Sequence, residues 1–124
     1  MNQQNQSIIN IQMQEADGYV IAALSEPLNL DNIEAFTTYI QNFIEEGNRR
    51  KILFDLSNLM NPGYRLRQKA IGLARTISGK TDRFALYAPQ QKMLFIGKLF
   101  LMVSGIQNSK IFNNKEEAIN WLKS

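Results

Sequence analysis

Residues 51–56, Lys-Ile-Leu-Phe-Asp-Leu, form a short and mostly apolar run near the middle of the chain. A run of this length without polar alternation is typical of a strand buried on both faces of a parallel sheet. The turn residues Asn61-Pro62-Gly63 follow, and apolar side chains then recur at helical spacing from about Tyr64 to Ser78. A buried strand followed by a helix is the repeating unit of an α/β fold. The inward side of this helix is expected to consist of Leu66, Ala70, Leu73, Ala74 and Ile77.

On the N-terminal side of this unit, the sequence predicts a β-hairpin and an amphipathic helix. Apolar and polar residues alternate from Ile9 to Met13, which favours a half-buried strand. Asp17-Gly18 is a hairpin turn signal, so we expect Tyr19–Leu24 to pair with the first strand. The following helix is expected between Asp31 and Gly47, with an apolar side made of Ile33, Phe36, Ile40, Phe43 and Ile44.

On the C-terminal side, two more strands alternate with two more helices. Arg83–Tyr87 is expected to be a strand that ends before Pro89. A helix from about Gln90 to Ser104 and a short strand at Lys110–Phe112 follow. The last helix is expected from Lys115 to Lys123.

This order of elements predicts one small α/β domain over residues 8–124. Alternating strands and helices after an opening hairpin imply a mostly parallel sheet with one antiparallel strand and about four helices. No linker or repeat divides the 124 residues, which suffice for one compact domain. The polar residues 1–7 are expected to be frayed.

The composition excludes most kinds of catalytic centre. The chain contains no cysteine and no histidine, which removes thiolate nucleophiles, imidazole bases and nearly every transition-metal site. The glycines have no phosphate-loop spacing. Asp55 is the one semi-buried acid expected, so neither a carboxylate pair nor a phosphoacceptor cluster with Mg²⁺ is expected. We therefore expect no enzymatic activity, no cofactor and no metal.

Charge is unevenly distributed along the chain, although the formal net charge is only +3. Residues 1–48 carry seven acidic and no basic residues, whereas residues 49–110 carry twelve basic and two acidic ones. We expect the two segments to neutralise each other in part on the surface. A basic face for an acidic partner stays open, but the bases form no continuous helical face, so nucleic acid is not the expected partner. Because no signal peptide or spanning segment is recognisable, we expect a soluble, cytoplasmic protein.

The predicted helix at 90–104 carries more apolar residues than one buried side requires. We expect its sheet-facing side to consist of Phe95, Ile96, Leu99, Met102 and Val103. Leu94 and Leu101 would then lie outward beside Lys98, where an ordinary surface helix has polar residues. Such an excess indicates a homodimer interface, a partner site or a lipid-facing patch, unless another part of the chain covers it.

Several short motifs resemble the STAS domain (sulfate transporter and anti-sigma-factor antagonist). They are Ile52–Leu59 (ILFDLSNL), Arg83–Pro89 (RFALYAP), Leu94–Phe100 (LFIGKLF), Lys110–Phe112 and Glu116–Leu122 (EEAINWL). The last four are similar to a STAS-like branch of bacterial proteins. The resemblance implies the α/β fold predicted above and a regulatory role through protein contact, as in anti-sigma factor antagonists.

The sequence departs from that family at one functional position. Sporulation-type antagonists carry a phosphorylated serine where the central strand meets the next helix, but residues 60–64 here contain no serine or threonine. Ser57 is the nearby hydroxyl, and it precedes this loop, so we do not carry the phosphorylation switch over to this chain. Asn61 and Tyr64 remain candidates for exposed contact residues.

Two functional hypotheses follow from the sequence. The first is a non-catalytic domain that binds a protein partner or itself, with Asn61, Tyr64, Leu94, Lys98 and Leu101 as candidate contacts. The second is a carrier of a small apolar ligand or lipid, with a cavity lined by Phe36, Phe43, Phe95 and Phe100.

Overall fold

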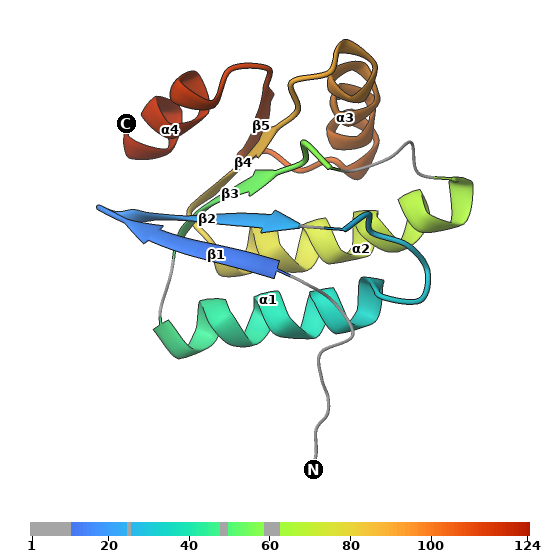
Figure 1. Cartoon of the computed structure of the whole chain (residues 1–124), viewed down its shortest axis with the longest axis horizontal. Coiled ribbons are helices and arrows are strands. Elements are labelled where there is room, and N and C mark those ends of the chain that lie inside the picture. Colours follow the sequence, from blue (N-terminus) through green and yellow to red (C-terminus); the bar gives the residue numbers. More distant parts are fainter. Residues whose placement is uncertain (1–10, 25, 48–49, 59–62) are drawn as a thin grey trace.

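The computed structural model describes residues 11–24, 26–47, 50–58 and 63–124. The elements follow the predicted order of two strands and then alternating helices and strands (Figure 1). Their bounds are β1 (Ile11–Ala16), β2 (Tyr19–Leu24), α1 (Ile33–Gly47), β3 (Lys51–Asp55), α2 (Tyr64–Lys80), β4 (Arg83–Tyr87), α3 (Gln91–Ser104), β5 (Ser109–Phe112) and α4 (Lys115–Lys123). The expectation of a frayed segment at 1–7 lies outside the described residues.

The five strands form one mixed sheet in the order β1-β2-β3-β4-β5. β1 pairs with β2 antiparallel through a turn in which Gly18 has a φ of 84°, a conformation that favours glycine. The other neighbours are parallel, and Leu53 on the central strand aligns with Ile21 on one side and Ala85 on the other. The prediction of a mostly parallel sheet with an N-terminal hairpin is confirmed.

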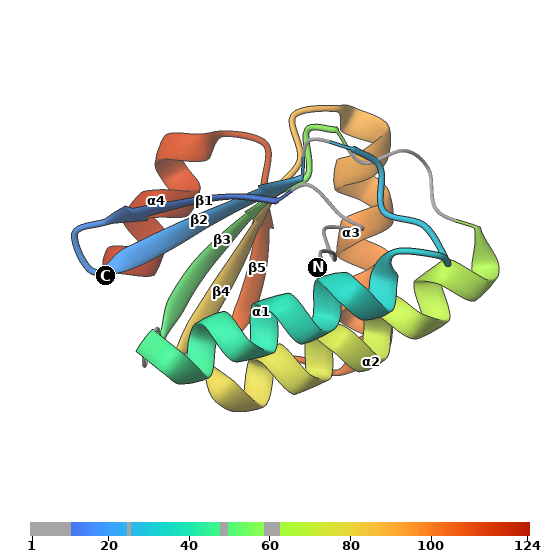
Figure 2. The same cartoon turned by 60° about the horizontal axis from the view of Figure 1, so that its bottom comes forward.

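The connections determine which helix covers which face of the sheet. Each crossover from β2 to β5 moves one strand in the same direction, and such crossovers are right-handed. α1, α2 and α3 therefore lie on one face, and α4, which follows the last strand, covers the other (Figure 2). The buried side chains of β3 alternate accordingly: Ile52 and Phe54 face α1 and α2, whereas Leu53 packs with Leu122 of α4. β3 is thus buried on both faces, as its apolar run predicts.

The orientation of α3 corrects the sequence-based expectation. Of its predicted sheet-facing residues, Phe95, Leu99, Met102 and Val103 are exposed, and Ile96 alone is half-buried. The residues that face inward are Met93, Gly97 and Ser104, together with the half-buried Ile96, Phe100 and Leu101, so the prediction holds for Ile96.

Gly97 provides the physical reason for this orientation. It lies against the side chain of Ile111 on β5, so closely that a Cβ at this position would overlap the Cδ1 atom of Ile111. α3 therefore packs its smallest residue against the edge strand, and its bulky residues on the far side remain exposed. Arg75 of α2 donates to the carbonyl of Ser104, and Gly105 has a φ of 73°, which together end the helix.

Replacing Gly97 by leucine is expected to lower the free energy of unfolding by about 1–3 kcal/mol, because α3 must move away from β5. Gly72 on α2 is the matched control, since it is an exposed helical glycine with no atom near its Cβ position. Gly72→Leu should leave stability unchanged or raise it slightly. Urea unfolding of both variants measures the difference, and equal stabilities would contradict the close packing of α3.

Candidate functional site

Asp55 is the last residue of β3, and its carboxylate contacts Lys115 and Ser57 at the carboxyl ends of the strands. One carboxylate oxygen, Oδ2, lies 2.8 Å from the Nζ of Lys115, the first residue of α4. The other, Oδ1, accepts hydrogen bonds from the Ser57 amide at 2.9 Å and from the Ser57 hydroxyl. Burial raises the pKa of Asp55, but the hydrogen bonds from Lys115 and Ser57 outweigh it, and the pKa falls below its ordinary value.

This geometry gives Asp55 a structural role. Lys115 places a positive charge at the N-terminus of a helix, where the helix dipole disfavours it, and Asp55 offsets that charge. The Lys115 ammonium also lies 5.3 Å from the centre of the Tyr87 ring on β4. Among the described residues there is no cluster of three metal-ligating side chains. Asp55 therefore connects β3 to α4, and its two oxygens are engaged.

The lowered pKa makes stability depend on pH in a defined direction. A carboxyl whose folded-state pKa lies below its unfolded value, about 3.9 for Asp, stabilises the fold above that value. This contribution should be lost as the pH falls from about 5 through the folded-state pKa. Asp55→Asn is expected to destabilise the protein by about 1–3 kcal/mol at pH 7. The variant should also lose less of its stability than the wild type when the pH is lowered. Melting temperatures measured from pH 7 to pH 3 report both effects. If the melting temperatures of the two proteins fell in parallel with pH, the stabilising role of the Asp55 carboxylate would be contradicted.

The predicted contact residues near the start of α2 have different environments. Tyr64 is 68% exposed and available for contact. Asn61 lies outside the described residues. Ser57 is half-buried, and its hydroxyl donates to Asp55. The N-cap of α2, Gly63, offers no side-chain hydrogen bond to the helix.

The outward side of α3 concentrates the exposed apolar residues. Among the described residues seven large apolar side chains are exposed, and four of them are Phe95, Leu99, Met102 and Val103. Successive members are four, three and one residues apart, which places them on one side of the helix. We call these four residues the α3 surface. Lys92 and Lys98 on the same helix are exposed as well. Lys98 is thus exposed as predicted.

Leu101 was predicted to lie outward on α3, but its side chain packs against the core, and Leu94 is half-buried. The excess of apolar residues on α3 is real, but different residues present it. No described helix is both long enough and apolar enough to cross a membrane.

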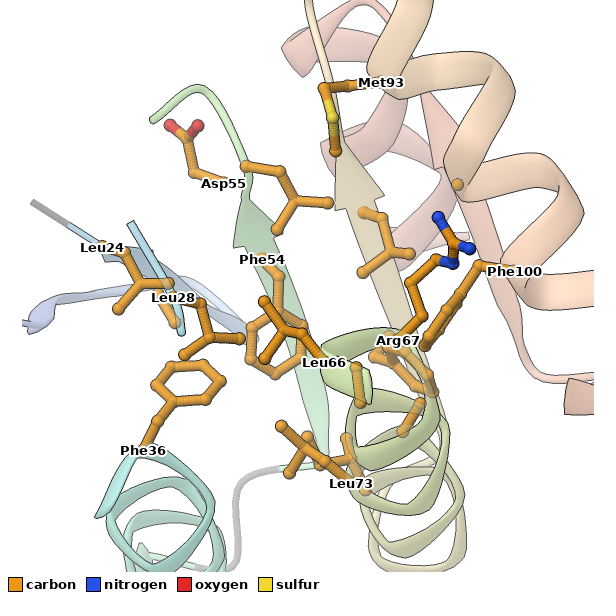
Figure 3. A pocket seen from close by; sticks show the side chains of 18 of the residues that line it. Leu24, Leu28, Phe36, Phe54, Asp55, Leu66, Arg67, Leu73, Met93 and Phe100 are labelled. Carbon is orange, nitrogen blue, oxygen red and sulfur yellow. The ribbon is translucent and has the colours of Figure 1, made fainter. Parts of the chain in front are cut away.

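A partly enclosed cavity of about 120 Å³ lies between the sheet and the helices α1, α2 and α3 (Figure 3). Its walls are almost entirely carbon, and the charged residues Asp55 and Arg67 also border it. The predicted lining is partly wrong. Phe36 and Phe100 line the cavity, whereas Phe95 is 63% exposed on the far side of α3 and Phe43 is not part of the wall.

Ion pairs join the acidic and basic segments of the sequence. Lys69 and Lys80 of α2 pair with Glu34 and Glu45 of α1, the first pair at 3.4 Å. The predicted partial neutralisation of the two segments is confirmed at these contacts. Such exposed pairs contribute little to stability.

No protein-family model matches the sequence, and no curated protein matches it. Solved structures do match, over nearly their whole length. An uncharacterised protein of the DUF3478 family with a SpoIIAA-like fold, from Shewanella loihica, is 16% identical with a TM-score of 0.66, covering 98% of this chain and 99% of its own. A putative anti-sigma factor antagonist from Thermotoga maritima is 20% identical with a TM-score of 0.72, covering 92% and 95%. The fold is STAS-like.

A third structure is the Bacillus cell fate determinant SpoIIAA in its phosphorylated form. It is 18% identical with a TM-score of 0.61, and the match covers 90% of this STAS-like chain and 98% of SpoIIAA. At these identities the likeness establishes the fold. The resemblance found in the sequence is therefore confirmed for the fold.

Two features of the STAS-like domain were missed by sequence reasoning. The ion pair of Asp55 with Lys115 joins residues sixty positions apart, and no local pattern indicates it. The orientation of α3 had one usable signal, namely Gly97 in the middle of a helix, where a glycine often marks a close approach.

Proposed function

We propose that this STAS-like domain is a non-catalytic regulatory module that acts by binding a protein partner through the α3 surface. The observation that carries the proposal is the exposure of Phe95, Leu99, Met102 and Val103, which lies between 45% and 76%. Contiguous exposed apolar side chains are typical of binding sites, because a monomer gains nothing from leaving them in water. The anti-sigma factor antagonists among the structural neighbours support a regulatory role.

The charges around the α3 surface indicate the chemistry of the partner. α3 contains Lys92 and Lys98 but no acidic residue. An apolar centre with a basic rim is complementary to an apolar protein surface with an acidic rim. Aromatic and methionine side chains such as Phe95 and Met102 are enriched at such interfaces.

Independent observations support the non-catalytic part of the proposal. The sequence offers no histidine or cysteine, and Asp55 is engaged by Lys115 and Ser57. Binding is the activity that these side chains support.

Lysine-directed cross-linking in cells of the source organism tests the proposal. Lys92 and Lys98 flank the α3 surface, whereas Lys69 on α2 and Lys123 on α4 are exposed elsewhere and serve as internal controls. We expect cross-links to one partner protein to concentrate at Lys92 and Lys98. Cross-links confined to Lys69 or Lys123, or no protein–protein cross-link at all, would contradict the proposal.

Light scattering distinguishes the two kinds of protein partner. If the partner is a second copy of this chain, the purified protein is a dimer and its cross-links join Lys92 or Lys98 to the same sequence. If the partner is a different protein, the purified chain is a monomer. Leu101 is not a suitable position for a charge substitution that probes the α3 surface, because its side chain packs against the core.

A further inference from the structure

The wall of the cavity under α2 and α3 includes small residues from three elements. Ala22 on β2, Ala70 and Ala74 on α2, and Gly97 on α3 all contribute to its wall. Larger side chains surround them, including Phe36, Phe54, Leu66, Leu73, Met93 and Phe100 (Figure 3). Protein interiors are normally close-packed, and a void costs stability in proportion to its volume. A space of about 120 Å³ in a domain of this size is therefore a feature to explain.

The chemistry of the wall excludes a polar occupant. A water molecule needs two or more polar partners, and the wall of this cavity is almost wholly apolar. The Asp55 carboxylate points away from the cavity in Figure 3 and pairs with Lys115. Arg67 lies beside Phe100 at one side, which disfavours a cationic occupant.

We propose that this cavity binds a small apolar molecule, aromatic or branched aliphatic, with about six to ten non-hydrogen atoms. An engineered protein cavity of about 150 Å³ lined by similar side chains stays dry and accepts benzene, so the volume here suits a ligand of that size. The ligand would contact Phe54 and Met93 and supply packing next to the small side chain of Ala70. This site is separate from the α3 surface, because it lies on the inward side of the same helix.

Methionine-methyl NMR of the full chain tests the proposal, with benzene and indole as the probes. Met93 lines the cavity and is 5% exposed, whereas Met102 is 76% exposed on the outer side of α3. We expect the Met93 resonance to shift in a saturable way at millimolar probe concentrations, with Met102 unchanged. No Met93 shift in the folded protein up to the solubility limit, or a shift at Met102 alone, would overturn the proposal.

A pair of matched variants distinguishes filling the cavity from a general effect of added volume. Ala70→Leu places a larger side chain in the cavity and should weaken binding at least tenfold. Ala35→Leu adds the same volume to a half-buried position of α1 outside the cavity and should leave binding unchanged. If Ala70→Leu does not fold, Ala74→Val serves the same purpose. Equal binding by the filled variant and the wild type would overturn the proposal.

Discussion

Replacing Phe95 and Met102 together by glutamate is expected to weaken partner binding at least a hundredfold and to leave the fold intact. The two side chains are 63% and 76% exposed, so their loss removes little packing from the folded monomer. In the complex, each carboxylate would be buried against an apolar surface, which costs several kcal/mol without a compensating charge. A hundredfold loss corresponds to about 2.8 kcal/mol, which two central interface residues readily supply.

A matched control separates the α3 surface from exposed apolar residues in general. Leu30→Glu with Tyr39→Glu introduces the same charges at two residues that are 42% and 44% exposed outside α3. Binding by this control should match the wild type. Titration calorimetry with the partner protein identified by cross-linking measures the affinities. If the partner is a second copy of this chain, analytical sedimentation measures them instead. If the control variant were weakened as strongly as the α3 variant, the α3 surface would not be the binding site.

Replacing Phe84 by alanine is expected to destabilise the protein by about 3–5 kcal/mol. Phe84 on β4 is 1% exposed, and its ring meets the Phe54 ring edge to face at a centroid distance of 6.0 Å. Both rings also line the cavity, so truncation of Phe84 enlarges an existing void that the neighbours cannot close. For a domain whose total stability is about 5–15 kcal/mol, this is a large fraction.

Tyr64→Ala is the control for the Phe84 prediction. Tyr64 is 68% exposed at the start of α2, so its truncation should change stability by less than about 0.5 kcal/mol. Denaturant unfolding monitored by the single tryptophan, Trp121, follows both variants. A loss below about 1 kcal/mol for Phe84→Ala would contradict the packing of β3 and β4 described here.

The order and type of the elements could be predicted because each has a local cause in the sequence. The run at 51–56 has no polar alternation, which identifies a doubly buried strand, and β3 occupies Lys51–Asp55. Asp17-Gly18 marks the hairpin, and Gly18 adopts the positive φ that such turns require. The helix at 33–47 has one clear apolar side, and its buried residues are those expected, apart from the half-buried Phe43.

The orientation of α3 could not be predicted from periodicity alone. Apolar residues occur on nearly every side of this helix, so its apolar pattern selects no single inward face. The close contact of Gly97 with Ile111 on the edge strand sets the orientation of α3, and this is a tertiary contact. Phe95 and Met102 are therefore exposed on the outward side of α3, whereas Leu94 and Leu101 are half-buried.

The most direct test of the account follows the Met102 methyl group by NMR while the partner identified by cross-linking is added to the wild-type protein. Met102 lies on the α3 surface, and Met13 on β1 reports a distant part of the sheet. The account predicts that the Met102 resonance shifts or broadens with the stoichiometry of binding while Met13 stays unchanged. A complex that forms with Met102 unperturbed would contradict it.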